Sequence, residues 1–375
     1  MKTLKDIKHL EGARVFLRAD FNVPIKNGAV VEDFRIRAAL PTIEYLRSRG
    51  AKVIIASHIE VLEGEKATLA PISKVLGKLG VPVMFVSDYK HIMRTVEEAK
   101  NGDCILLENL RSWEGEKNND PKFAKELASI ADIYVNDAFP VSHREHASVV
   151  GVPKYIPGYA GLQVEKEVEH LSKAFDPAHP FLFVLGGAKF STKLPLVKKF
   201  MSIADTVFIG GALSNDFYKA KGLEVGASLL SKEQLDPKEM RRFLADPKLM
   251  LPPDVVTQNR ETKAGNALSK TDIVRDDGPE TVKMLMPKIT TAKFILWNGT
   301  LGLCEDGFVD GTRGLAQAIA DATLRGATTI VGGGDTVAAI ESFGLRDKFT
   351  FLSTAGGAML DFLAKGTLPG LEVLK

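Results

Sequence analysis

Residues 328–339 read Thr-Thr-Ile-Val-Gly-Gly-Gly-Asp-Thr-Val-Ala-Ala, and this stretch decides how the rest of the chain is interpreted. An apolar run ends at Gly332–Gly334 and a helical pattern follows, which predicts a strand, a tight turn and a helix start. Glycines let a phosphate approach the backbone, and the N–H groups of a helix start attract anions. We expect Asp335 at the N-cap, where its carboxylate could cap the helix or hold a divalent cation. The stretch alone leaves an ordinary capped turn open, and it is not a P-loop because no Gly-Lys-Ser/Thr follows.

The composition indicates a soluble, cytoplasmic chain of about two domains, since its 375 residues can bury more than one core. A net charge of +2 gives no argument for nucleic acid or membrane as a partner. Cys104 and Cys304 each lie in an apolar, strand-like run, and we expect buried thiols rather than a disulfide. The polar segment Met1–Asp6 does not resemble a signal peptide, and no apolar run reaches about 18 residues.

Short apolar runs alternate with helical patterns along the whole chain, which predicts parallel sheets covered on both faces. The expected strands are Val15–Ala19, Val53–Ser57, Val83–Val86, Cys104–Leu107, Ile133–Asn136, Phe181–Leu185, Thr206–Ile209, Phe294–Trp297, Thr329–Val331 and Phe349–Leu352. The expected helices include Ile36–Arg49, Leu69–Leu79, Phe123–Ala131, Lys193–Ala204, Ser231–Leu244 and Gly314–Arg325.

A stretch rich in proline and glycine, Val152–Gly161, lies between the two groups of about five strands, and a charged helical pattern, Leu162–Phe175, follows it. This favours two doubly wound, Rossmann-like α/β domains joined by a hinge helix over a single (β/α)8 barrel. In doubly wound sheets, ligands bind at the carboxyl ends of the strands.

Arginine and histidine recur at the strand ends of the first half. They occur in Arg18–Pro24, Asp33–Arg37, Ala56–Ile59, Glu108–Arg111 and Asn136–His146. Each arginine alone reads as a solvated surface charge, but five occurrences on one rim of a sheet indicate a site for a small polyanion. His58, His143 and His146 lack the tight spacing of a metal site, so anion contact or a structural role is expected.

Glycine recurs at the strand ends of the second half. It occurs in Gly186–Lys193, Gly210–Ala212, Trp297–Gly302 and Ser353–Ala358. Lys189 and Lys193 are four residues apart and would share one helix face, which suits a triphosphate chain. A nucleotide is therefore the natural ligand of this half. The chain has no Gly-x-Ser-x-Gly motif and no cysteine beside a histidine, and this points to direct phosphoryl transfer rather than covalent catalysis.

In these motifs the chain resembles the phosphoglycerate kinase family over nearly its whole length. The pieces that carry the resemblance are Arg18–Pro24, Asp33–Ile36, Leu40–Ile43, Leu106–Arg111, Asn136–Phe139, His143–Ser148, Glu165–Glu167, Leu185–Lys189, Leu251–Val256, Gly278–Pro279, Trp297–Gly299, Gly332–Thr336, Ser353–Thr354 and Leu368–Gly370. The resemblance implies phosphoryl transfer between ATP and the carboxylate of 3-phosphoglycerate, forming ADP and 1,3-bisphosphoglycerate, with Mg2+ as cofactor.

The resemblance also assigns roles by position. The residues implied for 3-phosphoglycerate are Arg18, Asp20, Asn22, Arg35, His58, Arg111 and Arg144. Those implied for catalysis are Arg35, Lys189, Gly333 and Gly356, and Asp335 would hold Mg2+. Those implied for the nucleotide are Gly187, Lys193, Gly210, Gly211, Asn298, Glu305 (at the ribose), Gly332, Gly333, Gly334, Asp335 and Thr336.

The implied organisation is a phosphoglycerate domain of residues 1–158 and 366–375, a connecting helix 159–175 and a nucleotide domain 176–365, in a monomer. The substrate's own carboxylate would be the nucleophile, and closure of the domains would exclude water from a direct in-line transfer. We expect Asp335 and Lys189 to be buried at strand ends.

The chain departs from the family pattern within the implied site. The family usually reads Ser-His-Leu-Gly-Arg-Pro where this chain has Ser57–Leu62, so Val61 replaces an arginine and Glu60 adds a carboxylate. Losing one charge-assisted bond to an anion costs about 1.5–3 kcal/mol. Glu60 would add repulsion if it faces the site, and Arg37 or Lys66 could compensate. Further departures are Thr192, Thr300, Ala355 and Met359.

These departures leave open a weakened or inactive family member that still binds both ligands. A nicotinamide dehydrogenase is disfavoured because no Gly-x-Gly-x-x-Gly opens a first βαβ unit.

Overall fold

The structure, a computed structural model, describes residues 1–60, 67–188, 190–232 and 236–374, with the backbone alone for 190–192. The chain forms two compact units. Unit 1 contains residues 1–169 and the segment that begins at Lys365, and unit 2 contains residues 170–364. The division falls inside helix α6, Leu162–Ser172, which follows the proline- and glycine-rich stretch of the sequence.

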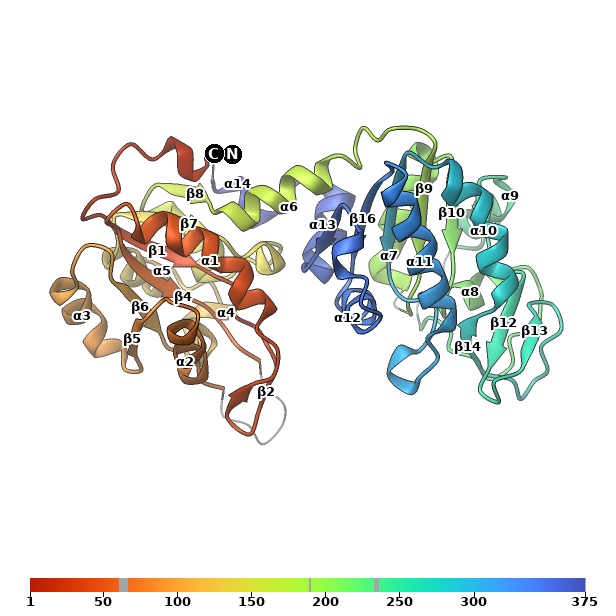
Figure 1. Ribbon diagram of the computed structural model, residues 1–375, viewed down its shortest axis with the longest axis horizontal. Helices are drawn as coiled ribbons and strands as arrows, with labels where there is room; N and C mark the ends of the chain where they lie inside the picture. The colour runs from red at the N-terminus through yellow and green to blue at the C-terminus, as the bar shows by residue number, and fades with distance from the viewer. Residues whose placement is uncertain (61–66, 189, 233–235, 375) are drawn as a thin grey trace. The chain divides into compact units, whose positions relative to one another are not determined.

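Unit 1 is built on a six-stranded, wholly parallel sheet in the order β5-β6-β4-β1-β7-β8 (Figure 1). Its strands are β1 Arg14–Arg18, β4 Lys52–Ala56, β5 Val83–Val86, β6 Cys104–Leu107, β7 Ile133–Asn136 and β8 Gly158–Ala160. The expected strands are confirmed within one residue, and β8 was missed because it lies in the stretch that reads as a boundary. The β1 and β4 side chains are buried almost throughout, which explains their continuous apolar pattern.

Helices cover the sheet of unit 1. They are α1 Phe34–Arg47, α2 Ala70–Lys78, α3 Ile92–Glu98, α4 Glu114–Lys117, α5 Pro121–Ser129, α6 and α14 Pro369–Glu372. Ile36 and Ile43 of α1 and Leu76 of α2 pack in one core with Val15 and Val53 of the sheet. Helix α5 begins two residues before the expected Phe123, because the Asp120 side chain accepts the backbone N–H of Lys122 and Phe123 and caps it.

Unit 2 contains a second six-stranded parallel sheet in the order β11-β10-β9-β15-β16-β17. Its strands are β9 Phe181–Leu185, β10 Thr206–Ile209, β11 Leu249–Met250, β15 Phe294–Asn298, β16 Thr328–Gly332 and β17 Phe351–Ser353. Its helices are α7 Phe190–Ile203, α8 Leu213–Ala220, α9 Pro237–Ala245, α10 Pro279–Thr291, α11 Asp310–Leu324, α12 Gly334–Ser342 and α13 Gly356–Lys365. Two doubly wound parallel sheets confirm the expected fold class and exclude the single barrel.

Smaller elements of the fold were not expected. β12 Asp254–Thr257 pairs antiparallel with β13 Thr262–Ala264 and β14 Val274–Asp277, and β2 Ile25–Lys26 pairs with β3 Ala29–Val30. Strands as polar as Val-Arg-Asp-Asp carry no apolar signal, so the sequence pattern could not reveal them.

Two local expectations were wrong. Helix α9 begins at Pro237 and not at Ser231, because Asp236 caps it and proline favours the first helical position. Cys304 lies in a 3-10 turn, η7 Cys304–Asp306, and not in a strand, and its thiol is half-buried and not buried.

The C-terminal segment completes unit 1, and both ends of the chain lie there (Figure 1). The Lys2 N–H donates to the Leu374 carbonyl at 2.9 Å, and the Asn136 side-chain amide donates to the Gly370 carbonyl at 3.0 Å. A Cβ at position 370 would lie 2.8 Å from Val149 Cγ1, so α14 packs closely at its glycine.

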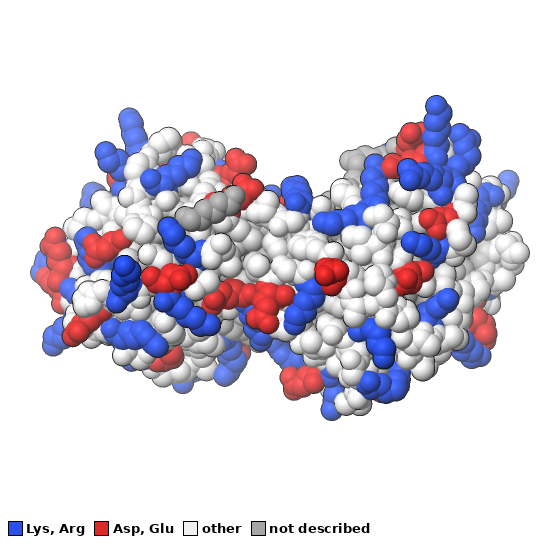
Figure 2. Space-filling view, turned by 90° about the horizontal axis from the view of Figure 1, so that it is seen from above, with Lys and Arg blue, Asp and Glu red and all other residues white. Residues whose placement is uncertain are grey.

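Charged side chains of both signs are interspersed on the face seen in Figure 2, in keeping with the near-neutral net charge. Within the described ranges, no helix has the length and apolar content that crossing a membrane requires.

Candidate active site

The predicted residues of the first half gather in unit 1 at the carboxyl ends of neighbouring parallel strands. Arg18 ends β1, His58 follows β4, Arg111 follows β6 and Arg144 follows β7. Arg35 is at the start of α1, directly beside this edge through its contact with Asp20. We call these five side chains the arginine cluster.

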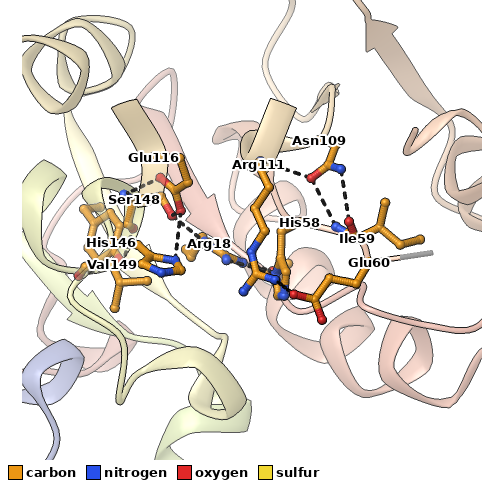
Figure 3. A network of polar contacts seen from close by, with 12 residues as sticks. Arg18, His58, Ile59, Glu60, Asn109, Arg111, Glu116, His146, Ser148 and Val149 are labelled. Carbon is orange, nitrogen blue, oxygen red and sulfur yellow. Dashed lines mark hydrogen bonds and ion pairs between the residues drawn. The ribbon is translucent and has the colours of Figure 1, made fainter. Parts of the chain in front are cut away.

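Arg18 and His58 form the buried centre of the arginine cluster (Figure 3). Arg18 has no exposed surface, and its Nη2 lies 3.1 Å from His58 Nδ1. Arg18 Nε donates to Ser148 Oγ at 2.8 Å, and Nη1 donates to the Ala19 carbonyl at 2.6 Å. The guanidinium is thus held on three sides by the protein, and its orientation is fixed before any ligand arrives.

Glu116, on the short helix α4, supplies a counter-charge that the sequence analysis missed. Its carboxylate is fully buried and accepts the Ser148 hydroxyl at 2.6 Å and the Ser148 N–H at 2.9 Å (Figure 3). His146 Nδ1 lies 3.8 Å from the same carboxylate. Ser148 therefore links the Arg18 cation to the Glu116 anion through a hydroxyl that is buried like both of them.

The position of His58 determines its protonation. An arginine can only donate, so His58 Nδ1 accepts from Arg18 and the neutral ring carries its proton on Nε2. Burial lowers the pKa of His58 well below 6.5, and the charges of Arg18, Arg111 and Arg35 lower it further. A neutral imidazole that carries its proton on Nε2 is suited to donate from this nitrogen to an oxyanion.

This titration predicts a pH dependence of stability. The His58 pKa is lower in the folded than in the unfolded chain. The contribution of His58 to the free energy of unfolding is therefore complete above about pH 6.5 and is lost as the pH falls. One such group gives a slope of up to about 1.4 kcal/mol per pH unit. The free energy of unfolding, measured in urea, should therefore fall more between pH 7 and pH 5 in the wild type than in His58→Gln.

Fluorescence can restrict this measurement to unit 1, because the chain has two tryptophans and Trp297→Phe leaves Trp113 as the reporter. The exposed His9→Gln serves as control and should keep the wild-type slope. Equal slopes in the wild type and His58→Gln would contradict the assignment of a neutral, buried His58.

Asp20 and Asn22, in the loop after β1, organise the outer part of the cluster. Arg35 Nη1 donates to Asp20 Oδ2 at 2.6 Å, and the Asn22 N–H donates to Asp20 Oδ1 at 3.2 Å. Arg144 is exposed, and its charge contributes to lowering the pKa of His146 after the larger effect of burial. The structure therefore brings together all seven residues predicted for phosphoglycerate.

Glu60 faces the site, as the sequence allowed, and forms an ion pair with Arg111. Arg37, named above as a residue that could compensate, is paired through its Nε with Asp33 at 2.8 Å. Lys66, Val61 and Lys189 lie outside the described residues, as does the side chain of Thr192.

Four of the predicted nucleotide residues, Gly187, Gly211, Glu305 and Asp335, line a cavity of about 230 Å3 in unit 2. We call it the glycine cavity. Its lining includes Gly187, Ala188, Gly211, Ala212, Thr300, Leu301, Gly302, Glu305 and Asp335. The departure Thr300 thus lines the cavity, and its carbonyl accepts the Gly187 N–H at 2.8 Å.

Close backbone contacts explain the glycines of these turns. A Cβ at Gly186 would lie 2.3 Å from the Thr300 carbonyl oxygen, and Gly299 combines a φ of +96° with a Cβ position 2.3 Å from the Gly186 carbonyl oxygen. Side chains larger than hydrogen would separate the two turns, so their close approach depends on these positions.

Two buried carboxyl groups bind the Gly211 turn and the start of α11, and the sequence analysis missed them. Asp277 accepts the Gly211 N–H at 3.1 Å, and Asp276 accepts the Gly311 N–H at 3.1 Å. Burial raises the pKa of Asp276 to about 7, and it raises that of Asp277 well above its usual range with added repulsion from Asp276. The two consecutive aspartates at the end of β14 were the available signal.

Strand β15 and the Gly332–Thr336 turn are joined directly. Thr336 Oγ1 accepts the Gly299 N–H at 3.0 Å, and the Asn298 amide lies 4.0 Å from the sulfur of buried Met359. A Cβ at Gly356 would come within 3.9 Å of the Gly334 N–H, so helices α12 and α13 start beside each other. Ala355 is buried just before α13. The departures Ala355 and Met359 thus belong to the packing beneath this turn.

Lys193 lies against the glycine turns. It is 7% exposed, and its ammonium donates to the Gly186 carbonyl. The ammonium nitrogen lies 2.7 Å from the Cβ positions that side chains at Gly187 and Gly299 would occupy. The lysine therefore points back to the strand end, as its position in the sequence predicted.

Asp335 differs from expectation in two ways. The N-cap of α12 is Gly333, with a φ of +104°, and Asp335 is the second residue of the helix. Asp335 is exposed and lines the glycine cavity, and is not buried.

One exposed carboxylate beside a cavity fits Mg2+, which typically binds one or two protein carboxylates together with substrate phosphates. In the part of the chain that the structure describes, no group of three or more acidic, histidine or cysteine side chains could hold a metal without a substrate.

Comparison with known proteins gives concordant matches over the whole chain. A family model described as "Phosphoglycerate kinase" matches residues 4–366. The phosphoglycerate kinase of Dictyoglomus turgidum is 45% identical over 393 residues, covering 100% of this chain and 99% of the relative. That of Thermosipho africanus is 45% identical over 390 residues, covering 98% and 96%.

Solved structures agree with these matches. The phosphoglycerate kinase of Coxiella burnetii superposes with a TM-score of 0.86 at 37% identity, covering 99% of this chain and 98% of that one. The Pyrococcus horikoshii OT3 enzyme gives a TM-score of 0.85 at 31% identity, covering 100% and 98%.

Proposed function

The chain belongs to the phosphoglycerate kinase family, and we propose that its arginine cluster holds phosphoglycerate while its glycine cavity holds the nucleotide. Its function is the family's kinase reaction, phosphoryl transfer between ATP and 3-phosphoglycerate. The observation that supports our assignment is the chemical contrast between the two sheet edges. One presents guanidinium and imidazole groups, and the other presents glycine turns around a cavity.

The arginine cluster is suited to bind and orient a substrate with a phosphate and a carboxylate. Arg18 and His58 are fixed by buried contacts, so little rotamer freedom is lost when an anion binds. Arg35 stands at the start of α1 with a part-exposed guanidinium, from which it would steady the phosphoryl group in transfer. The substrate carboxylate is itself the nucleophile, so the protein supplies position and charge.

The glycine cavity would receive the nucleotide. Its glycine turns admit phosphates to the backbone, Glu305 lies on its wall to bond the ribose, and Lys193 stands at the end of β9 for the phosphates. Gly333 and Gly356 flank the starts of α12 and α13, whose N–H groups favour the negative charge of the phosphoryl group. The catalytic role proposed for Lys189 is supported by the sequence resemblance alone.

Asp335 would hold the Mg2+ that accompanies the nucleotide. When bound, this ion neutralises charge on the phosphates during transfer. We further propose that the enzyme is a cytoplasmic monomer, with residues 1–158 and 366–375 for phosphoglycerate, 159–175 as hinge and 176–365 for the nucleotide. In this proposal the transfer is direct and in line, and it follows closure of the domains on both ligands.

Turnover of the purified protein with ATP, Mg2+ and 3-phosphoglycerate tests the function, with the acyl phosphate read through an NADH-consuming reductase. We expect turnover, because the cations and glycines of both sites are present despite the departures. An inactive protein that still binds both ligands would instead establish the alternative of a non-catalytic binder. The relatives reported above give that alternative no support.

Asp335→Asn tests the metal role. We expect the Mg2+ concentration for half-maximal rate to rise about 10- to 100-fold, because one charge-assisted bond to the ion is lost. Glu305→Gln, on the same cavity, is the matched control and should raise the KM for ATP while leaving the Mg2+ requirement unchanged. An unaltered Mg2+ requirement in Asp335→Asn would remove Asp335 from the metal site.

A further inference from the structure

Glu60 is a carboxylate placed on a cation of the arginine cluster. It lies two residues beyond His58 in the loop after β4, and its Oε1 is paired with Arg111 Nη1 (Figure 3). The two partners differ in exposure, because 67% of the Glu60 side chain is exposed and 13% of the Arg111 side chain. Glu60 therefore reaches from solvent onto a mostly buried guanidinium.

The backbone around this pair is held in place by Asn109. The buried Asn109 amide oxygen accepts the N–H groups of Ile59 at 3.2 Å and Arg111 at 3.1 Å, and its amide nitrogen donates to the Ile59 carbonyl at 3.1 Å (Figure 3). The Glu60 N–H donates to Asn22 Oδ1 at 2.8 Å. Glu60 and Arg111 thus start from two loops that are fastened to each other, so their contact is a built feature of the site.

Arg111 retains capacity for an anion beyond this contact. Its Nε is buried and has no hydrogen-bond partner among the described residues. Burial lowers the pKa of both His58 and His146, and the positive charge of Arg111 lowers both further. A guanidinium with an unsatisfied, buried N–H beside two other donor groups is suited to an oxyanion with several acceptor oxygens.

Three carboxylates accompany the described cations of the cluster, and Glu60 differs from the other two. Asp20 is 6% exposed and Glu116 fully buried, and both belong to the fixed framework of Arg35 and Arg18. Glu60 is largely exposed, so its carboxylate can turn into water at small cost. It is the carboxylate of the three that an incoming anion can displace.

We propose that Glu60 is a tethered competitor for Arg111, which the anionic substrate must displace before it binds, and that it sets the affinity for phosphoglycerate. The proposal rests on the assignment of the arginine cluster to phosphoglycerate. The competing carboxylate lowers the occupancy of the site at a given substrate concentration and favours release of the bound molecule. Glu60 thus acts on substrate affinity through Arg111 and is not a catalytic residue.

Calorimetric binding of 3-phosphoglycerate to the full chain, without nucleotide, tests the proposal with Glu60→Gln. Glutamine keeps the shape of the side chain and removes its charge. We expect the Kd to fall about three- to tenfold, because the substrate no longer competes with a carboxylate for Arg111. The gain should shrink at 0.5 M salt, since the contact lies near the surface and is screened.

Two further variants make the result specific. Glu98→Gln removes a similarly exposed glutamate charge, paired with Arg94 on α3 outside the arginine cluster, and should leave the Kd unchanged. In an Arg111→Gln background, Glu60→Gln should no longer tighten binding, because the cation for which it competes is absent.

An unchanged or higher Kd in Glu60→Gln would overturn the proposal, as would an equal gain in the Arg111→Gln background. Failure of the underlying assignment looks different, because neither the wild type nor any of the variants would then bind 3-phosphoglycerate.

Discussion

Arg18→Met is expected to destabilise unit 1 by about 3–5 kcal/mol and to abolish measurable phosphoglycerate binding. The substitution leaves the fully buried Glu116 carboxylate without its cation, while Ser148 Oγ remains bound to it. It also removes the donor that fixes the His58 tautomer. The free energy of unfolding, followed by Trp113 fluorescence in the Trp297→Phe background, measures the effect.

Arg14 provides the matched control because it lies on the same strand, β1. It pairs with Asp132 at 2.5 Å, and both side chains are about one third to one half exposed. Arg14→Met should cost less than about 1 kcal/mol, as exposed ion pairs do.

A second substitution separates stability from binding. Adding Glu116→Gln to Arg18→Met should recover a large part of the stability, because no uncompensated buried charge remains, and should not recover binding. Equal losses in Arg14→Met and Arg18→Met, or no recovery in the double variant, would contradict the role of this buried pair.

Lys193→Met is expected to lower kcat/KM for the magnesium–nucleotide complex by about 10²- to 10³-fold, the loss typical of a preorganised group that stabilises the transition state. The buried ammonium is held at the Gly186–Gly187 turn, where the phosphates would lie. Steady-state kinetics with varied ATP at saturating 3-phosphoglycerate measures the effect.

Lys198→Met, also on α7, controls for the loss of a lysine from this helix. Lys198 pairs with Glu239 at 2.7 Å and is half exposed, so its loss should change kcat/KM by less than about twofold. A Lys193→Met enzyme within a few-fold of the wild type would show that the nucleotide phosphates are held without Lys193.

The arginine cluster could be predicted from the sequence because parallel strands share a direction. Once β1, β4 and β6 are recognised, the residues that follow them must meet at one edge, and Arg18, His58 and Arg111 do so. The same reasoning applies in unit 2, where the glycine turns after β9, β10 and β15 line one cavity. Motif order then allowed the family to be named, since so many strand-end pieces in one sequence rarely agree by chance.

The supporting carboxylates could not be predicted in this way. Glu116 lies on a four-residue helix among other charged residues, and only tertiary packing buries it beneath Ser148. Asp276 and Asp277 end a strand too polar to be recognised. The exposure of Asp335 depends on where α12 begins, and a shift of one or two residues turns a side chain to another face of a helix.

The sequence showed the charge of Glu60, and the structure was needed to find its partner. Comparison with the family pattern singled out Glu60 as a departure, and its charge suggested repulsion of the substrate. In the structure, Asn109 binds the backbone of both loops, and the Glu60 carboxylate is paired with Arg111. An ion pair of this kind depends on the directions of two side chains, and the patterns of a single sequence do not give those directions.

The C-terminal segment that completes unit 1 has a consequence for synthesis on the ribosome. Residues 170–364 form a contiguous unit and can fold as soon as they emerge. Unit 1 is translated first, yet the Gly370 carbonyl that accepts from Asn136, and the glycine of α14 that packs on Val149, emerge only after all of unit 2. Residues 1–169 therefore cannot complete the fold of unit 1 until the C-terminal segment has been synthesised. Unit 2, although it is synthesised later, can reach its final fold earlier.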